Sequence, residues 1–168
     1  MIPTDNLGCV MLRCGTGTDE PLIEPDWAAN PDVLPDYCEG TAFLDPNGLH
    51  LTLKHGLLPS LVTVEDVDEA LAGWRPPPIL FVTGFELFGG GDGWKALVAT
   101  VENRPGLQQA NHWLSLLPHI DTWPGYRAHV TLGYIKPGLR IGDFDPPEIR
   151  AFITREIFHS GLGRRADQ

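Results

Sequence analysis

The sequence lacks the features that mark membrane proteins and disulfide-stabilised proteins. None of its apolar runs approaches the roughly 20 residues that span a bilayer, and residues 1–5 contain neither a basic region nor an apolar core. We therefore expect no signal peptide and no membrane anchor. Only three of the 168 residues are cysteine, and no Cys-x-x-Cys occurs. Neither a disulfide scaffold nor a zinc knuckle is indicated, and we expect a cytoplasmic protein.

Positive charge is also scarce. Twelve Lys and Arg residues face 22 Asp and Glu residues, which gives a formal net charge of −10. Proteins that bind long nucleic acids take much of their affinity from Lys and Arg that neutralise phosphates, so we expect no long nucleic acid as a partner. A few local cations are enough to hold a small phosphate-containing ligand, and that class of partner stays open.

A phosphate-loop motif and a reactive cysteine are not indicated either. The glycine-rich run at 89–93 has no Gly-Lys-Ser/Thr after it and lies between two strand-like segments. It is therefore predicted to be a turn, because a phosphate loop leads into a helix N-terminus. Cys9 and Cys14 flank an apolar segment, and we expect both thiols to be inert residues of the core or of a sheet edge.

The pattern of apolar residues predicts one α+β domain over residues 1–168. Strands are predicted at 8–14, 48–56, 79–88, 94–102, 127–135 and 151–158, and helices begin at Thr63 and Asn103. Five prolines interrupt residues 16–48, which we expect to form an irregular loop, either a surface insertion or a ligand lid. We expect residues 161–168 to be a mobile tail. The order of elements indicates two related halves around a common cleft.

Two of the predicted strands share the motif His-x-Thr-Leu. The first contains His50 and Thr52, and the second contains His129 and Thr131. Side chains alternate along a strand, so each histidine shares one face with its threonine while apolar residues occupy the other face. Two such strands predict a site in which two histidines converge.

Two imidazoles near neutral pH can transfer protons in opposite directions. One takes a proton from an attacking hydroxyl, and the other gives a proton to the leaving oxygen. Neighbouring threonine hydroxyls can donate hydrogen bonds to phosphate oxygens. This chemistry suits cleavage of a phosphodiester without a metal. Zinc is the competing chemistry, although neither motif supplies a third ligand. A further alternative is that both histidines are ordinary core residues, which is uncommon for histidine.

Residues near the motifs are candidates for binding the substrate. Strict alternation places Lys54 on the face of His50 and Arg127 on the face of His129, so that two cations bracket a phosphate. The alternative is that both cations lie in solvent past the strand ends. Trp123 and Tyr126 precede the second motif and are candidates for stacking on a base, with core packing as the alternative role.

The paired motifs resemble the signature of the 2H phosphoesterase superfamily, which includes 2′-5′ RNA ligase-like proteins, cyclic phosphodiesterases and related nucleases. The resemblance implies a bilobal α+β fold in which two pseudo-symmetric antiparallel sheets, flanked by helices, surround a central cleft. It also implies catalysis without a metal or cofactor, with His50 and His129 as the acid–base pair and Thr52 and Thr131 as phosphate-binding hydroxyls. Residues 16–48 depart from the family, whose members usually place a helix there.

Residues 50–57 are particularly similar to a phage branch of this superfamily, whose members degrade the cyclic oligonucleotide signals of bacterial CBASS immunity. That similarity implies a cyclic di- or trinucleotide as the substrate and a viral protein that acts in the host cytoplasm. Two other functions stay open. One is an RNA-processing enzyme that acts on 2′,3′-cyclic ends or 2′-5′ linkages, and the other is a protein that sequesters a nucleotide without cleaving it. The oligomeric state and the assignment of acid and base are also open.

Overall fold

The computed structural model describes residues 6–18, 46–89, 93–102, 104–122, 125–143 and 147–166. Within these ranges the chain is an α+β domain, as predicted. Its strands are β1 (Gly8–Gly15), β2 (Leu49–Leu57), β3 (Ile79–Phe88), β4 (Lys95–Val101), β5 (His129–Ile135) and β6 (Ala151–Ser160). Its α-helices are α2 (Val64–Ala70) and α3 (Pro105–Leu114), and η2 (Ile141–Asp143) is a short 3₁₀ helix.

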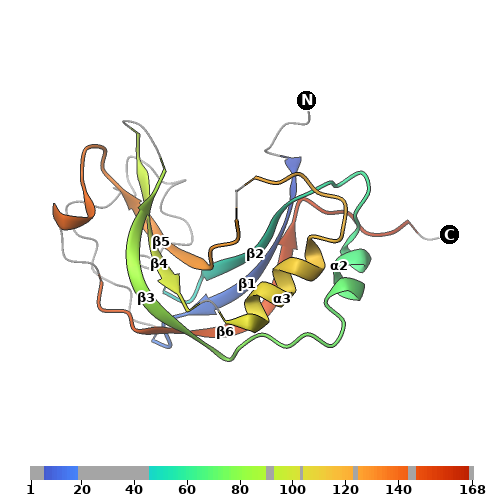
Figure 1. Ribbon diagram of the computed structural model, residues 1–168, viewed down its shortest axis with the longest axis horizontal. Helices are drawn as coiled ribbons and strands as arrows, with labels where there is room; N and C mark the ends of the chain where they lie inside the picture. The colour runs from blue at the N-terminus through green and yellow to red at the C-terminus, as the bar shows by residue number, and fades with distance from the viewer. Residues whose placement is uncertain are drawn as a thin grey trace.

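The strands close into an antiparallel ring in the order β1-β2-β5-β4-β3-β6 (Figure 1). Long ladders join β6, β1 and β2 into one sheet and β3, β4 and β5 into a second sheet. Shorter seams join the two sheets, at β2–β5 through Leu51 opposite Val130 and at β3–β6 around Leu80 opposite Phe152. The predicted α+β fold built from antiparallel strands is therefore correct, and the structure adds that each lobe has three strands.

A hydrophobic core on one face of the strands is shared by both lobes. Leu51 on β2, Val130 on β5 and Leu97 on β4 are all fully buried in it. Each fully buried side chain of this size contributes about 1.5–3 kcal/mol relative to exposure. Because alternate residues of each strand are committed to this core, the intervening residues of β2 and β5 face away from it.

Helix α2 begins where the sequence predicts. The Thr63 hydroxyl accepts from the main-chain N–H of Asp66, and the Asp66 carboxylate accepts from the N–H of Thr63 at 2.8 Å, so the capping box is complete. The helix ends at Ala70, and the chain then turns through Gly73 at a φ of +79°. Trp74 then lies outside the helix, where its indole donates to the carbonyl of Gly106 at 2.9 Å.

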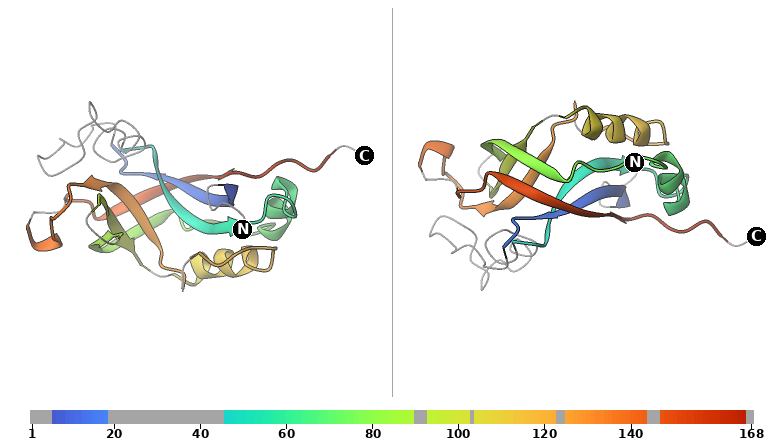
Figure 2. Two further views of the ribbon diagram at one scale, coloured as in Figure 1. Left: turned by 90° about the horizontal axis from the view of Figure 1, so that it is seen from above. Right: turned by 90° about the horizontal axis from the view of Figure 1, so that it is seen from below.

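Helix α3 covers the outside of the first lobe and is tied to β2. Its N-cap is Arg104, whose side chain makes no capping hydrogen bond, whereas the predicted N-cap Asn103 lies outside the described residues. The side-chain amide of Asn111 donates to the carbonyl of Leu53 at 2.7 Å. Both helices lie at the same end of the molecule (Figure 2).

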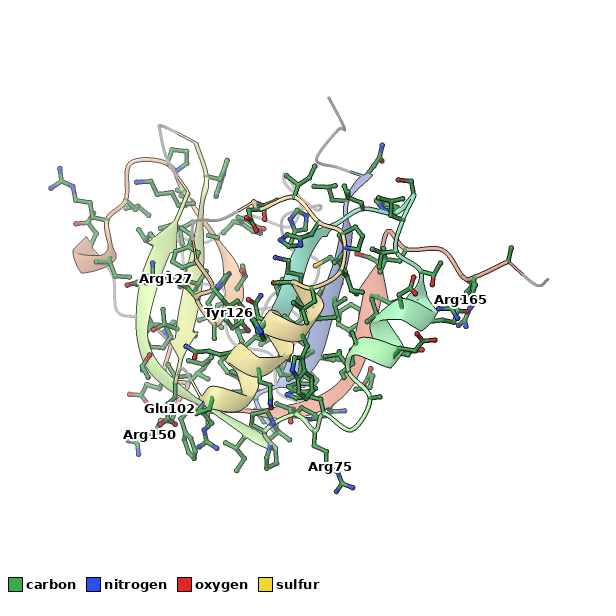
Figure 3. All side chains as sticks on the ribbon, turned by 45° about the vertical axis from the view of Figure 1, so that its right-hand side comes forward. Arg75, Glu102, Tyr126, Arg127, Arg150 and Arg165 are labelled. Atoms are coloured by element: carbon green, nitrogen blue, oxygen red, sulfur yellow. The ribbon has the colours of Figure 1, made fainter. Side chains whose placement is uncertain are left out.

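The C-terminal segment contacts α2 as far as Arg165, which differs from the expected mobile tail. The main-chain N–H of Val64 donates to the carbonyl of Gly163 at 2.9 Å. Arg165 pairs with Asp66 at 2.9 Å and with Glu69 at 3.2 Å, and Figure 3 shows it beside α2. Local sequence patterns do not indicate these contacts, because Arg165 is 99 positions from Asp66 and 96 positions from Glu69. Most of the predicted loop at 16–48 lies outside the described residues.

Candidate active site

The seam between β2 and β5 brings the two His-x-Thr motifs side by side. Leu51 is the middle residue of the first motif, Val130 is the middle residue of the second, and the two are directly opposite each other. Both are fully buried, so they anchor their strands in the core. The residues on either side of this pair point to the opposite face. The seam therefore presents four polar side chains on one surface.

The register of the seam fixes how these four side chains are arranged. Continuing the antiparallel pairing by one residue on either side of Leu51 and Val130 sets His50 opposite Thr131 and His129 opposite Thr52. The two histidines are consequently diagonal neighbours, about 7–8 Å apart between strand positions. All four side chains are partly exposed. The structure thus places the four predicted catalytic residues together, each histidine beside the threonine of the other motif.

Both motifs are followed by a β-bulge. On β2, the ladder with β1 skips Leu53, and on β5 the ladder with β4 skips Leu132. Both leucines are fully buried. A bulge bends its strand, strengthens the local twist and is common beside active sites. The two motifs therefore share a bulge at the same position, three residues after the histidine.

His50 sits among groups that favour the neutral imidazole. Its partner on β1 is Arg13. The ring of Phe158 on β6 meets the imidazole of His50 edge-on, with the ring centroids 6.1 Å apart. Burial lowers the pKa of His50 below its ordinary value of 6.5, and the charges of His129 and Arg13 lower this pKa further. This influence of His129 agrees with the diagonal placement of the two imidazoles across the seam.

His129 is oriented by its own neighbourhood. Its Nδ1 donates to the main-chain carbonyl of Arg127 at 2.7 Å, and its ring packs on Phe88 of β3 with centroids 4.7 Å apart. A carbonyl can only accept, so the Nδ1 atom carries a hydrogen. The Nε2 atom of His129 is therefore the one that exchanges protons with a ligand.

Lys54 does not lie where strict alternation places it. The bulge at Leu53 makes Lys54 the partner of Val10, whose side chain is fully buried in the core. Lys54 itself is 9% exposed, and its Nζ lies 3.8 Å from the carboxylate of Asp121. Burial lowers the pKa of Lys54, and Asp121 opposes this effect. The predicted pairing of Lys54 with the face of His50 is wrong, because the bulge interrupts the alternation.

The other predicted substrate-binding residues have different surroundings. Arg127 is largely exposed, pairs with Glu86 and lies over the ring of Phe88. The hydroxyl of Tyr126 donates to the main-chain carbonyl of Thr52 at 3.2 Å, and burial raises the pKa of this phenol. Trp123 lies outside the described residues.

Apart from Arg127, the residues that surround each histidine were not predicted from the sequence. In the first lobe an arginine, a glutamate and a phenylalanine adjoin His50, and in the second lobe the same three residue types adjoin His129. These residues are Arg13, Glu156 and Phe158 in the first lobe, and Arg127, Glu86 and Phe88 in the second. A sequence signal was available, because Glu-Leu-Phe at 86–88 and Glu-Ile-Phe at 156–158 repeat one pattern on β3 and β6.

Burial raises the pKa of Cys9 to about 11 and that of Cys14 to about 12, which disfavours a thiolate at either position. Over the ranges that the structure describes, no three side chains of His, Cys, Asp or Glu come together as a metal site requires. In the same ranges no helix has the length and apolar character to cross a membrane.

These features define an α+β domain with a site of two histidines and two threonines at the seam of its lobes. No protein-family model matches the sequence, and no curated protein matches it. Among solved structures the chain is similar to Kluyveromyces marxianus Usb1, with 12% sequence identity over 78% of this chain and 71% of that chain and a TM-score of 0.43. Because this likeness is weak, the function below rests on the side chains of this protein.

Proposed function

We propose that this protein is a metal-independent phosphodiesterase of the 2H type that cleaves a small cyclic nucleotide. The observation that carries the proposal is the register of β2 and β5, in which Leu51 opposite Val130 sets His50 and His129 diagonally across one exposed face. Imidazoles on diagonal positions of one seam can both reach a phosphate placed between them, each through a hydrogen bond of about 2.8 Å.

The two histidines take opposite roles in this proposal. The neutral His50, whose pKa is lowered, removes the proton from the attacking hydroxyl, which is a ribose hydroxyl or a water molecule. The attacking oxygen forms a bond to phosphorus, and the bond from phosphorus to the leaving oxygen breaks. The Nε2 atom of His129, whose ring is fixed by the Arg127 carbonyl, gives its proton to that leaving oxygen. Proton exchange with water then restores both histidines.

The threonines stabilise the phosphate as charge develops on it. Thr131 lies opposite the proposed base, and Thr52 lies opposite the proposed acid, so a hydroxyl is available on each side of the phosphorus. Hydrogen bonds that are stronger in the transition state than in the bound substrate lower the barrier to the reaction. Hydrogen bonds that are equally strong in both states do not.

The proposed substrate is a cyclic di- or trinucleotide, in keeping with the similarity of residues 50–57 to the phage branch named above. On this proposal the protein is a viral counter to bacterial cyclic-nucleotide immunity and acts in the host cytoplasm. The net charge of −10 supports a small ligand over a long nucleic acid. The arginines beside the histidines, Arg13 and Arg127, are each paired with a glutamate, which limits the local positive charge.

Mass spectrometry of the reaction products tests the proposal. The protein is incubated with EDTA and a panel of cyclic di- and trinucleotides, 2′-5′-linked oligoadenylates and RNA with 2′,3′-cyclic ends. We expect linear products from the cyclic nucleotides. Products from the RNA substrates alone would move the function to RNA processing, and recovery of every compound intact would favour sequestration.

Matched histidine variants show whether the activity belongs to the site. His50→Ala and His129→Ala should each lower kcat by about 100-fold or more, while His112→Ala, which changes an exposed histidine of α3, should keep the full rate. An active His50→Ala or His129→Ala protein would contradict the proposed acid–base pair.

A further inference from the structure

Each proposed catalytic histidine is accompanied by one arginine, one glutamate and one phenylalanine. In the first lobe the guanidinium of Arg13 lies 4.5 Å from the ring centroid of Phe158, and its Nε donates to Glu156 at 2.6 Å. We name Arg13, Glu156 and Phe158 the first-lobe triplet. Phe158 also meets His50 edge-on, so the triplet is continuous with the proposed active site.

The second lobe repeats this arrangement beside His129. The guanidinium of Arg127 lies 5.3 Å from the ring centroid of Phe88 and pairs with Glu86. We name Arg127, Glu86 and Phe88 the second-lobe triplet. In both triplets the glutamate and phenylalanine are two residues apart on one strand, so their side chains share a face. The two triplets therefore flank the histidine pair from opposite lobes.

The chemistry of the triplets suits a nucleobase better than a phosphate. A carboxylate offsets the charge of each guanidinium, which weakens its attraction for an anion. The guanidinium carbon of each arginine lies over a phenylalanine ring, and the side chains of Arg13 and Arg127 are 36% and 63% exposed. Bases stack on guanidinium planes, and a carboxylate can accept a hydrogen bond from an exocyclic amine.

We propose, on the basis of the function proposed above, that the two triplets are nucleobase subsites on either side of the scissile phosphate. The substrate class is then a dinucleotide unit with a base on both sides of the cleaved bond, as in a cyclic dinucleotide. A nucleoside 2′,3′-cyclic phosphate has one base and fills one subsite. The arginine planes, held by phenylalanine and glutamate, fix the position of each nucleoside relative to His50 and His129.

The chain contains a matched control for these triplets. Arg104 lies 5.1 Å from the ring centroid of Phe81 and pairs with Glu102 at 3.2 Å, which is the same chemistry. Phe81 and Phe88 are seven positions apart on β3, or about 23 Å along the strand. Among the described residues no histidine ring packs on Phe81, and Figure 3 shows Glu102 well separated from Arg127.

Arginine-to-lysine variants test the proposal, because lysine keeps the charge but lacks the plane. The variants are Arg13→Lys and Arg127→Lys, with Arg104→Lys as the control. The probes are cyclic di-AMP, cyclic di-GMP and cyclic di-UMP, compared with adenosine 2′,3′-cyclic monophosphate. We expect each of the first two variants to lose about 10- to 100-fold in kcat/KM on the best cyclic dinucleotide. Only one of these two variants should lower kcat/KM for adenosine 2′,3′-cyclic monophosphate. The control variant Arg104→Lys should keep kcat/KM within about twofold of the wild-type value on every probe.

Binding constants separate this proposal from the function that it extends. The same arginine variants are made in the His129→Ala protein, and the Kd for each cyclic dinucleotide is measured by calorimetry. We expect Arg13→Lys and Arg127→Lys to raise the Kd about 10-fold or more, even if the wild-type protein turns over none of the probes. The proposal is overturned if either variant keeps wild-type affinity, if the probes bind too weakly to measure, or if Arg104→Lys has an equal effect. Thermal unfolding of all variants excludes loss of the fold as the cause.

Discussion

Tyr126 donates its phenolic hydrogen to the main-chain carbonyl of Thr52, at a distance of 3.2 Å. Thr52 belongs to the first His-x-Thr motif, and Tyr126 lies three residues before the histidine of the second motif. The hydrogen bond therefore joins the approach to β5 directly to β2, next to the seam. Figure 3 places Tyr126 between the two lobes. This contact helps to hold the two motifs in their mutual position.

Removing this hydroxyl should loosen the seam. We expect Tyr126→Phe to lower the free energy of unfolding by about 1 kcal/mol, because the Thr52 carbonyl loses its partner, and to lower kcat severalfold. Ser115→Ala is the matched control, since the Ser115 hydroxyl donates to the Asn111 carbonyl at 2.7 Å within the end of α3. Ser115→Ala should lower the free energy of unfolding by a similar amount and leave kcat unchanged. Urea unfolding and steady-state kinetics measure the two quantities. Equal kinetics for both variants would show that the Tyr126 contact does not position the site.

The pH dependence of kcat/KM should be bell-shaped. A base must be deprotonated, so activity rises as the pH rises through the pKa of His50, and this limb should lie below pH 6.5 because burial and neighbouring charge lower that pKa. Activity then falls at higher pH, because the general acid must carry the proton that it gives to the leaving oxygen. The profile should be the same with and without EDTA. Activity that disappears with EDTA and returns with a divalent ion would overturn the metal-independent mechanism.

Each threonine hydroxyl should contribute to the rate. Thr52→Val and Thr131→Val keep the shape of the side chain and remove its hydroxyl, so each should lower kcat by about 100-fold. Thr52→Ser and Thr131→Ser retain the hydroxyl and should recover most of the rate. Steady-state kinetics on the best substrate of the panel measures this difference. Valine and serine variants of equal activity would remove the threonines from the mechanism.

Gly56 should tolerate no side chain. It has a φ of +101°, and a Cβ atom there would lie 2.2 Å from the main-chain oxygen of Ile120. Gly73 has a similar φ of +79° but faces open space. We therefore expect Gly73→Ala to cost about 1 kcal/mol for the left-handed backbone, and Gly56→Ala to cost at least about 1–3 kcal/mol more because of overpacking. Denaturant unfolding compares the two, and equal costs would argue against the close approach of Ile120.

The fold and the four central side chains could be predicted because they depend on local patterns. Alternation along 48–56 and 127–135 was sufficient to assign His50 and His129 to polar faces, and both strands formed as expected. The capping box at Thr63 was likewise visible in the sequence. Such patterns act over a few residues and need no knowledge of the partner strand.

The features that were missed depend on partners distant in the sequence. The bulge at Leu53 arises from the ladder with β1, and no residue of β2 alone indicates it. Because of this bulge, Lys54 lies near Asp121, and the cation beside His50 is Arg13 of β1. Identifying Arg13 requires the register of β1 against β2, which single-strand periodicity does not contain.

The single pair of Leu51 and Val130 also determines which changes of chain length the site can tolerate. A slip of one residue in β2 or β5 would turn the motif to the buried face, and a slip of two residues would move its histidine by about 6.6 Å. The separation of the two histidines therefore changes only in steps that are too coarse to be compensated by side-chain movement. Insertions and deletions should be excluded from β2 and β5, while the connections between the strands remain free to vary in length.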